Sequence, residues 1–183
     1  LAQRDGLESF ELKAQLQLAR LHTQIDNWAD AEEHLDAAET LIQSLATPEA
    51  TSYAPLVQGA RAQLYLAMDR KAEALNAAQA AVAEATAQEK EVDLAICQRI
   101  LAETLLAHGR SGEAAELARE ALAHLGARNP YETAKTKALL GLAHFSGGKL
   151  ETLQTEHGHR ELAEAKITLT RLGAKLDLAA LEG

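Results

Sequence analysis

Apolar and small residues recur along this chain at steps of three and four residues, the spacing that places side chains on one face of an α-helix. Leu12, Leu16 and Ala19 begin this pattern, and similar runs continue almost to the last residue. Residues that interrupt helices separate the runs, including Asp26, Asp69 and Gly109. The pattern predicts helices over about 7–25, 28–45, 54–68, 70–87, 90–109, 111–126 and 130–147.

The small residues within these helices form a repeat. In the first helix of each pair, Ala19 is followed by Ala62 after 43 residues, by Ala102 after a further 40, and by Gly141 after a further 39. The second helices carry a matching series, with a small or apolar residue again after four and seven positions: Ala31, Leu35 and Ala38; Ala74, Ala78 and Ala81; Ala114, Ala118 and Ala121. Because the two series advance together, the repeating unit is a pair of helices about 40 residues long.

Small residues at matching positions allow antiparallel helices to approach closely. A single pair cannot bury its own apolar face, whereas a stack of pairs can. We therefore expect one domain spanning 1–183, with units over about 8–46, 54–88, 91–126 and 130–173. Residues 174–183 form a capping or truncated helix in this interpretation. The alternative is an alanine-rich helical bundle whose periodicity is accidental.

The fourth unit is irregular. The alanine expected in its second helix, Ala163, lies 49 residues after Ala114, so about ten extra residues fall between Gly147 and Glu161. Either the turn is enlarged or one long helix begins early, near Glu151, and we favour the long helix. The chain begins at Leu1 without Met, which suggests a piece of a longer protein.

Composition agrees with an all-helical chain and limits its functions. The 39 alanines and the scarcity of aromatic residues, 3% of the chain, disfavour a sheet. The net charge of −9 argues against direct nucleic-acid binding, which needs a surplus of Lys and Arg on one face. No apolar run is long enough to span a bilayer, and the first ten residues lack a signal-peptide core. Cys97 is the single cysteine, so we expect a cytoplasmic protein without disulfides.

Three segments resemble tetratricopeptide repeats: LARLHTQIDNWADAEEHLDAAETL, QLYLAMDRKAEALNAAQAAV and AETLLAHGRSGEAAELAREAL. Trp28 and Tyr65 stand at aromatic positions of the motif, and Gly109 stands at its turn. The units are longer than the usual 34 residues and largely lack the closing proline. In this they are similar to the repeats of maltose-regulator-like transcriptional activators and related signalling NTPases. Neither a GxxxxGK[ST] phosphate loop nor a basic helix-turn-helix segment is present.

The resemblance implies an all-α, right-handed superhelical solenoid of antiparallel helix pairs, whose first helices line a concave groove. The residues that it places in this protein- or peptide-binding groove are Lys13, Leu16, Arg20, Gln24, Gln63, Leu66, Arg99, Glu103, Leu106, Lys135, Leu142 and Phe145. Four of them are basic in an acidic chain, which favours an acidic peptide or a C-terminal carboxylate as partner. The alternative is that these cations only solvate a helix face.

Candidate chemistry is sparse. Glu156, His157 and His159 look like metal ligands, but residues two apart on a helix point in nearly opposite directions, so solvated histidines are the simpler interpretation. His22 and His144 occupy equivalent repeat positions and are expected to line a helix seam. Cys97, beside Ile96 and Ile100, is expected to be a buried apolar residue. No residue pattern indicates catalysis, a cofactor or a metal site.

The sequence therefore predicts a non-catalytic scaffold that binds a peptide or a partner domain, taken from a larger signalling or regulatory protein. The alternative is the inducer-sensing segment of a transcriptional regulator, which would bind a small molecule in the groove. An enzyme is the least favoured class. A homo-oligomer is compatible with both leading functions.

Overall fold

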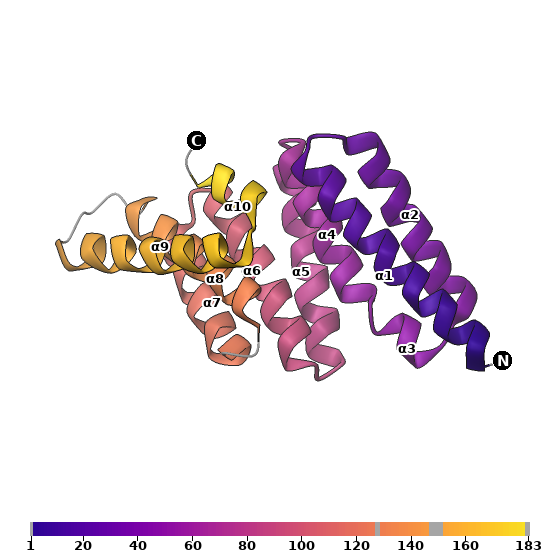
Figure 1. Cartoon of the computed structure of the whole chain (residues 1–183). Helices are drawn as coiled ribbons and strands as arrows, with labels where there is room; N and C mark the ends of the chain where they lie inside the picture. The colour runs from indigo at the N-terminus through magenta and orange to yellow at the C-terminus, as the bar shows by residue number, and fades with distance from the viewer. Residues whose placement is uncertain (1, 127–128, 147–151, 182–183) are drawn as a thin grey trace. The chain divides into compact units, whose positions relative to one another are not determined.

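The structure is a computed structural model that describes residues 2–126, 129–146 and 152–181. Throughout these residues the chain forms helices and their connections, with no strand (Figure 1). It divides into two compact units, Leu1–Lys90 and Glu91–Gly183, and each is described by itself. The predicted all-α arrangement of antiparallel helix pairs is confirmed within both units. No described helix combines the length and apolar character needed to cross a membrane.

The first unit contains two helix pairs and a short connecting helix. Its elements are α1 (Ala2–Gln24), α2 (Trp28–Leu45), α3 (Pro48–Thr51), α4 (Ala54–Ala67) and α5 (Lys71–Ala87). Helix α1 packs along α2, α4 packs along α5, and α4 also packs against α1 and α2. The short α3 was not predicted. Thr47 caps this helix by accepting a hydrogen bond from the Ala50 amide at 3.2 Å, and Pro48 occupies its first turn.

The second unit repeats this plan with a longer final pair. Its elements are α6 (Glu91–Ala107), α7 (Ser111–Leu125), α8 (Pro130–Ser146), α9 (Thr152–Leu172) and α10 (Lys175–Ala180). Helix α8 packs against α6, α7 and α9, and α10 packs against α9. Asp177 ties α10 to α8, because it accepts a hydrogen bond from the Tyr131 hydroxyl at 2.9 Å and pairs with Lys135 at 3.2 Å.

The predicted small residues lie at the helix seams. The side chains of the following alanines are all 0% exposed: Ala19, Ala31, Ala38, Ala62, Ala74, Ala78, Ala81, Ala102, Ala114, Ala118 and Ala121. Gly141, the fourth member of the first-helix series, is buried as well. Cys97 is also fully buried, as predicted. The repeat read from the sequence is therefore a repeat of packing.

Equivalent residues also form the turns within the helix pairs. Asp26, Asp69 and Gly109 follow one another at the repeat spacing, and their φ angles are 58°, 57° and 73°. Each reverses the chain through one residue in the left-handed region, which glycine adopts freely and aspartate tolerates better than most residues. These positions were predicted as helix breaks, and the structure confirms them.

In the fourth pair, the single long helix is confirmed but its predicted register is wrong. Ala163 is exposed, whereas Ala165 is 0% exposed and Leu169 is 1% exposed. The inward positions Ala114, Ala118, Ala121 and Leu125 of α7 recur 44 residues later in α9 as Gly158, Leu162, Ala165 and Leu169. Since the corresponding first-helix spacing is 39 residues, the enlargement is about five residues rather than ten.

The register of α9 follows from a close contact between two glycines. A Cβ atom placed on Gly141 would lie 2.7 Å from Leu162 Cγ and 2.9 Å from the Gly158 carbonyl oxygen. A Cβ atom placed on Gly158 would lie 3.2 Å from the Gly141 carbonyl oxygen. Helices α8 and α9 thus approach each other backbone to backbone at this point, which explains why the alanine series changes to glycine here.

This contact predicts opposite effects for two Gly→Ala substitutions. Gly141→Ala should lower the free energy of unfolding by about 1–3 kcal/mol, because the new methyl group has no room between α8 and α9. Gly112→Ala, in the first turn of α7 where a Cβ would meet nothing within 4 Å, should be neutral or stabilising by up to about 1 kcal/mol. Urea denaturation of both variants tests this. Equal effects would mean that α8 and α9 do not meet as described.

Candidate functional site

In the first unit, the residues predicted to line a groove have different environments. Lys13 and Gln24 are exposed on α1, and Arg20 is half-buried. Gln63 and Leu66, on α4, are half-buried. Leu16 is only 2% exposed and belongs to the core cluster between α1, α2 and α4, so a partner could not contact it without opening that core.

In the second unit, several predicted groove residues contact each other or neighbouring helices. Leu142 is exposed, and Leu106 is half-buried. Phe145 is half-buried and makes an edge contact with the His159 ring, with 4.8 Å between ring centres. Lys135 is 19% exposed and pairs with Asp177, so its charge anchors α10.

Arg99 forms a buried ion pair instead of a surface cation. Its Nε donates to Glu132 at 2.9 Å and its Nη1 donates to Glu103 at 3.3 Å. The Arg99 and Glu132 side chains are 4% and 8% exposed. Burial opposes the charge of Arg99, but the two carboxylates outweigh this effect and raise its pKa above the ordinary value. The pair therefore connects α6 to α8 in the interior of the unit.

An exposed apolar stripe on α1 was not predicted from the sequence. Phe10, Leu18, Leu21 and Ile25 are 70%, 38%, 44% and 51% exposed, and exposed Ala14 lies among them. Successive steps of three or four residues place these side chains on one face, on the side of α1 away from the core residues. We call these five residues the α1 outer face. The signal was present as a second apolar periodicity in α1, but the core periodicity obscured it.

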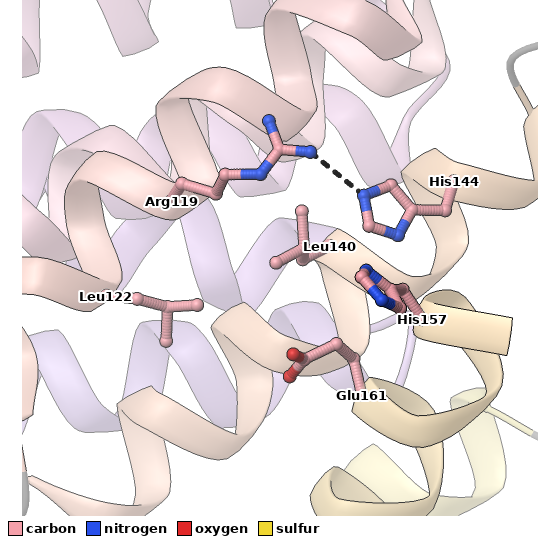
Figure 2. A pocket seen from close by; sticks show the side chains of 6 residues that line it. All are labelled: Arg119, Leu122, Leu140, His144, His157 and Glu161. Atoms are coloured by element: carbon pink, nitrogen blue, oxygen red, sulfur yellow. Dashed lines mark hydrogen bonds between the residues drawn. The ribbon is translucent and has the colours of Figure 1, made fainter. Parts of the chain in front are cut away.

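A pocket of about 360 Å³ lies between α7, α8 and α9 (Figure 2). Its lining residues are Arg119, Leu122, Leu140, His144, His157 and Glu161. Four of these six carry titratable side chains, and two of those side chains contain buried polar atoms that lack a hydrogen-bond partner. The pocket was not predicted, because its residues come from three helices and share no sequence motif.

His144 lies at the centre of the polar lining. The Arg119 Nη2 atom donates to His144 Nε2 at 3.0 Å (Figure 2). A guanidinium group can only donate, so Nε2 accepts and the ring proton resides on Nδ1. His144 Nδ1 is buried and has no hydrogen-bond partner. Burial, Arg119 and His157 all disfavour the imidazolium form, which lowers the pKa of His144 below its ordinary value.

Glu161 presents the second unsatisfied atom. Its Oε2 is buried and accepts no hydrogen bond. The Lys137 Nζ atom lies 3.9 Å from Oε2, too far for a hydrogen bond, and Lys137 makes a closer ion pair with Glu164. The pocket thus contains a buried donor on His144 and a buried acceptor on Glu161, each without a hydrogen-bond partner.

The candidate metal ligands do not converge. Glu156, His157 and His159 all lie on the continuous helix α9, where His157 lines the pocket and His159 contacts Phe145. Within the described residues, no group of three or more His, Cys, Asp or Glu side chains is arranged to hold a metal ion. His22, the repeat equivalent of His144, is half-buried. Its Nδ1 atom lies 3.1 Å from the Asn27 Nδ2 atom.

Comparisons with known proteins show the fold. No protein-family model and no curated protein matches the sequence. Two crystal structures of a Podosopora anserina protein, described as a candidate kinesin light chain with nearly identical TPR-like repeats, are similar to this chain. One, a variant with a single substitution, has a TM-score of 0.60 at 19% identity; the other has a TM-score of 0.50 at 18% identity. Both alignments cover 95% of this chain and 92% of the other. The TPR-like fold expected from the sequence is therefore confirmed.

The buried pair yields a stability prediction. Arg99→Leu should lower the free energy of unfolding by about 3–5 kcal/mol, because Glu132 would remain buried without its closest cation. The double variant Arg99→Leu/Glu132→Leu should recover a large part of this loss. Arg110→Leu, which breaks an exposed pair with Glu113, should lower stability far less than Arg99→Leu. Chemical denaturation measures all three; similar losses for Arg99→Leu and Arg110→Leu would contradict the buried pairing.

The lowered pKa of His144 predicts a pH dependence. As pH falls through the ordinary histidine pKa, the unfolded chain takes up a proton at this position more readily than the folded chain, whose His144 pKa is lower. Stability from His144 should therefore decrease below about pH 6.5. The variant His144→Gln should show a shallower decline between about pH 7 and pH 5 in thermal unfolding. A steeper decline in the variant would reverse the assigned direction.

Proposed function

We propose that this protein is a non-catalytic interaction scaffold and that the α1 outer face is its docking surface for a helical segment of another protein. The observation that carries this proposal is the exposed apolar stripe of Phe10, Leu18, Leu21 and Ile25. Exposed apolar residues scattered singly are common, but a continuous stripe along one helix marks an interaction surface. An amphipathic helix lying along the stripe would bury it.

The repeat supports a helix as the occupant. At the repeat spacing of 43 residues, Leu18 corresponds to Arg61, while the other four members of the α1 outer face, Phe10, Ala14, Leu21 and Ile25, correspond to Tyr53, Val57, Leu64 and Met68. These residues of α4 and its flanking turns pack into the core formed with α1 and α2. The equivalent face of α4 therefore receives helices of the preceding pair. Because its apolar residues follow the same spacing, the α1 outer face is suited to pack against helices.

Charge supports an acidic partner. Lys13 and Arg20 lie on the same edge of the α1 outer face, seven residues apart. The Lys13 Nζ atom lies 5.5 Å from the centre of the Phe10 ring and 5.6 Å from that of Tyr53, within cation–π range. The neighbouring Tyr53 hydroxyl raises the pKa of Lys13. A helix with acidic residues along the facing edge would complement this border.

The same border disfavours self-association through α1. Two copies of α1 packed antiparallel about a two-fold axis place the same edge of each helix side by side. Lys13 and Arg20 of one copy would then face the corresponding cations of the other, and like charges across an interface oppose association. We therefore propose a different protein as the partner.

This proposal retains part of the predicted groove. Lys13, Arg20 and Gln24 border or adjoin the docking surface, whereas Leu16 and Arg99 serve the interior. The charge reversal Arg99→Glu would consequently perturb folding rather than report on binding. Membership in a maltose-regulator-like activator remains a proposal, as does small-molecule sensing, which the pocket between α7, α8 and α9 supports.

Two synthetic helical peptides test the docking surface. Both carry the same leucine stripe, one with glutamates along its edges and the other with lysines. The glutamate peptide should bind more tightly in fluorescence anisotropy, and Leu21→Glu or Lys13→Glu should weaken its binding by at least about tenfold. Glu33→Lys, an exposed charge change on α2, is the control and should leave affinity unchanged. Equal affinity for both peptides, or insensitivity to Leu21→Glu in a folded variant, would refute the proposal.

A further inference from the structure

We propose that the pocket between α7, α8 and α9 binds a free α-amino acid with an uncharged side chain. This inference concerns the second unit and stands independently of docking on α1. It rests on the two buried atoms that lack a hydrogen-bond partner, the placement of charges around them and the apolar walls.

The two atoms without a hydrogen-bond partner define what a ligand must offer. His144 Nδ1 carries a proton because Nε2 accepts from Arg119, so Nδ1 needs an acceptor. Glu161 Oε2 needs a donor. The great majority of buried polar atoms in folded proteins are hydrogen-bonded, so each exception needs an explanation. A ligand that brings an acceptor and a donor would satisfy both atoms.

The charges determine which end of the ligand lies where. Arg119 stands beside His144, so the acceptor end would meet a cation as well as the Nδ1 proton (Figure 2). A carboxylate fits this end, since carboxylates accept strong hydrogen bonds from guanidinium groups. Glu161 is anionic, and an ammonium group is the donor that best compensates a buried carboxylate. Neighbouring carboxylate and ammonium groups on one small molecule are the defining feature of a free α-amino acid.

Other ligand classes fit less well. A phosphate or other dianion would be repelled by Glu161. A peptide terminus supplies either the carboxylate or the ammonium group, but not both on adjacent atoms. Lys137 forms a long ion pair with Glu161 at 3.9 Å and pairs more closely with Glu164 on α9, which leaves Oε2 available to accept a hydrogen bond from a donor in the pocket.

The apolar lining and the volume of the pocket determine which side chain the bound amino acid can carry. Leu122 from α7 and Leu140 from α8 form the uncharged part of the wall (Figure 2). A volume of about 360 Å³ lies at the lower end of the range for small-molecule sites. Aliphatic amino acids such as leucine, valine and methionine would therefore be preferred over lysine or glutamate, whose charge would meet this wall.

The glycine contact holds the site in place. His144 lies one helical turn after Gly141, and His157 and Glu161 lie immediately before and one turn after Gly158. Because Gly141 and Gly158 bring α8 and α9 together backbone to backbone, the three side chains are held by a rigid junction. A ligand contacting both helices would bind a largely preformed pocket.

Calorimetric titration of the whole chain with leucine, valine, methionine, glycine, lysine and glutamate tests the inference. The three aliphatic amino acids should bind and raise the melting temperature. N-acetyl-leucine and leucinamide, which each lack one charge, should bind at least about tenfold more weakly than leucine. In NMR spectra, the His144 ring nitrogens should shift on addition of leucine.

Substitutions of pocket residues test whether leucine binds in this pocket. Glu161→Gln and His144→Phe should each weaken leucine binding by at least about tenfold. Arg110→Gln, an exposed change in the same unit, is the matched control and should not. Circular dichroism checks that each variant is folded, and if Glu161→Gln is unstable, His144→Phe decides the question.

No binding of any aliphatic amino acid at millimolar concentration, or undiminished binding of N-acetyl-leucine or leucinamide, would overturn the proposal. Failure of peptide docking on α1 would leave this result unaffected, so the two proposals are tested separately.

Discussion

The close approach of antiparallel helices at small residues is the constraint on which the rest of this structure depends. With few aromatic side chains to fill space, the helices must meet through alanine and glycine, and eleven seam alanines are 0% exposed. Interiors pack as densely as organic crystals, so a single added methyl group at such a seam must displace a backbone or a neighbouring side chain. The spacing of the small residues thereby determines which helices pair and in what register.

The same constraint creates both candidate binding surfaces. Helix α4 packs against α1 and α2 of the preceding pair, and the face of α1 that corresponds to this packed face of α4 is apolar and exposed. In the second unit, the enlargement of about five residues shifts α9 so that Gly158 meets Gly141. Three residues near these glycines, His144, His157 and Glu161, then line the pocket.

The environments of the charged residues could not be predicted from the sequence. Arg99, Lys135 and Lys13 look alike in the sequence, since each lies on the first helix of a pair. In the structure Arg99 is buried against Glu132, Lys135 anchors α10 through Asp177, and Lys13 is exposed. A long cationic side chain adopts whichever partner its surroundings provide, and those partners lie 33 and 42 residues away for the first two. Local periodicity carries no information about them.

The sequence by itself determined the all-α class, the helix pairs, most helix bounds and the seam alanines. These features depend on interactions within a few residues or on a repeat that copies the same local solution. Only the tertiary structure decided the register of α9, the burial of Arg99, the exposed second face of α1 and the pocket. Each of these arises where residues distant in sequence meet, and such meetings depend on the packing of whole helices.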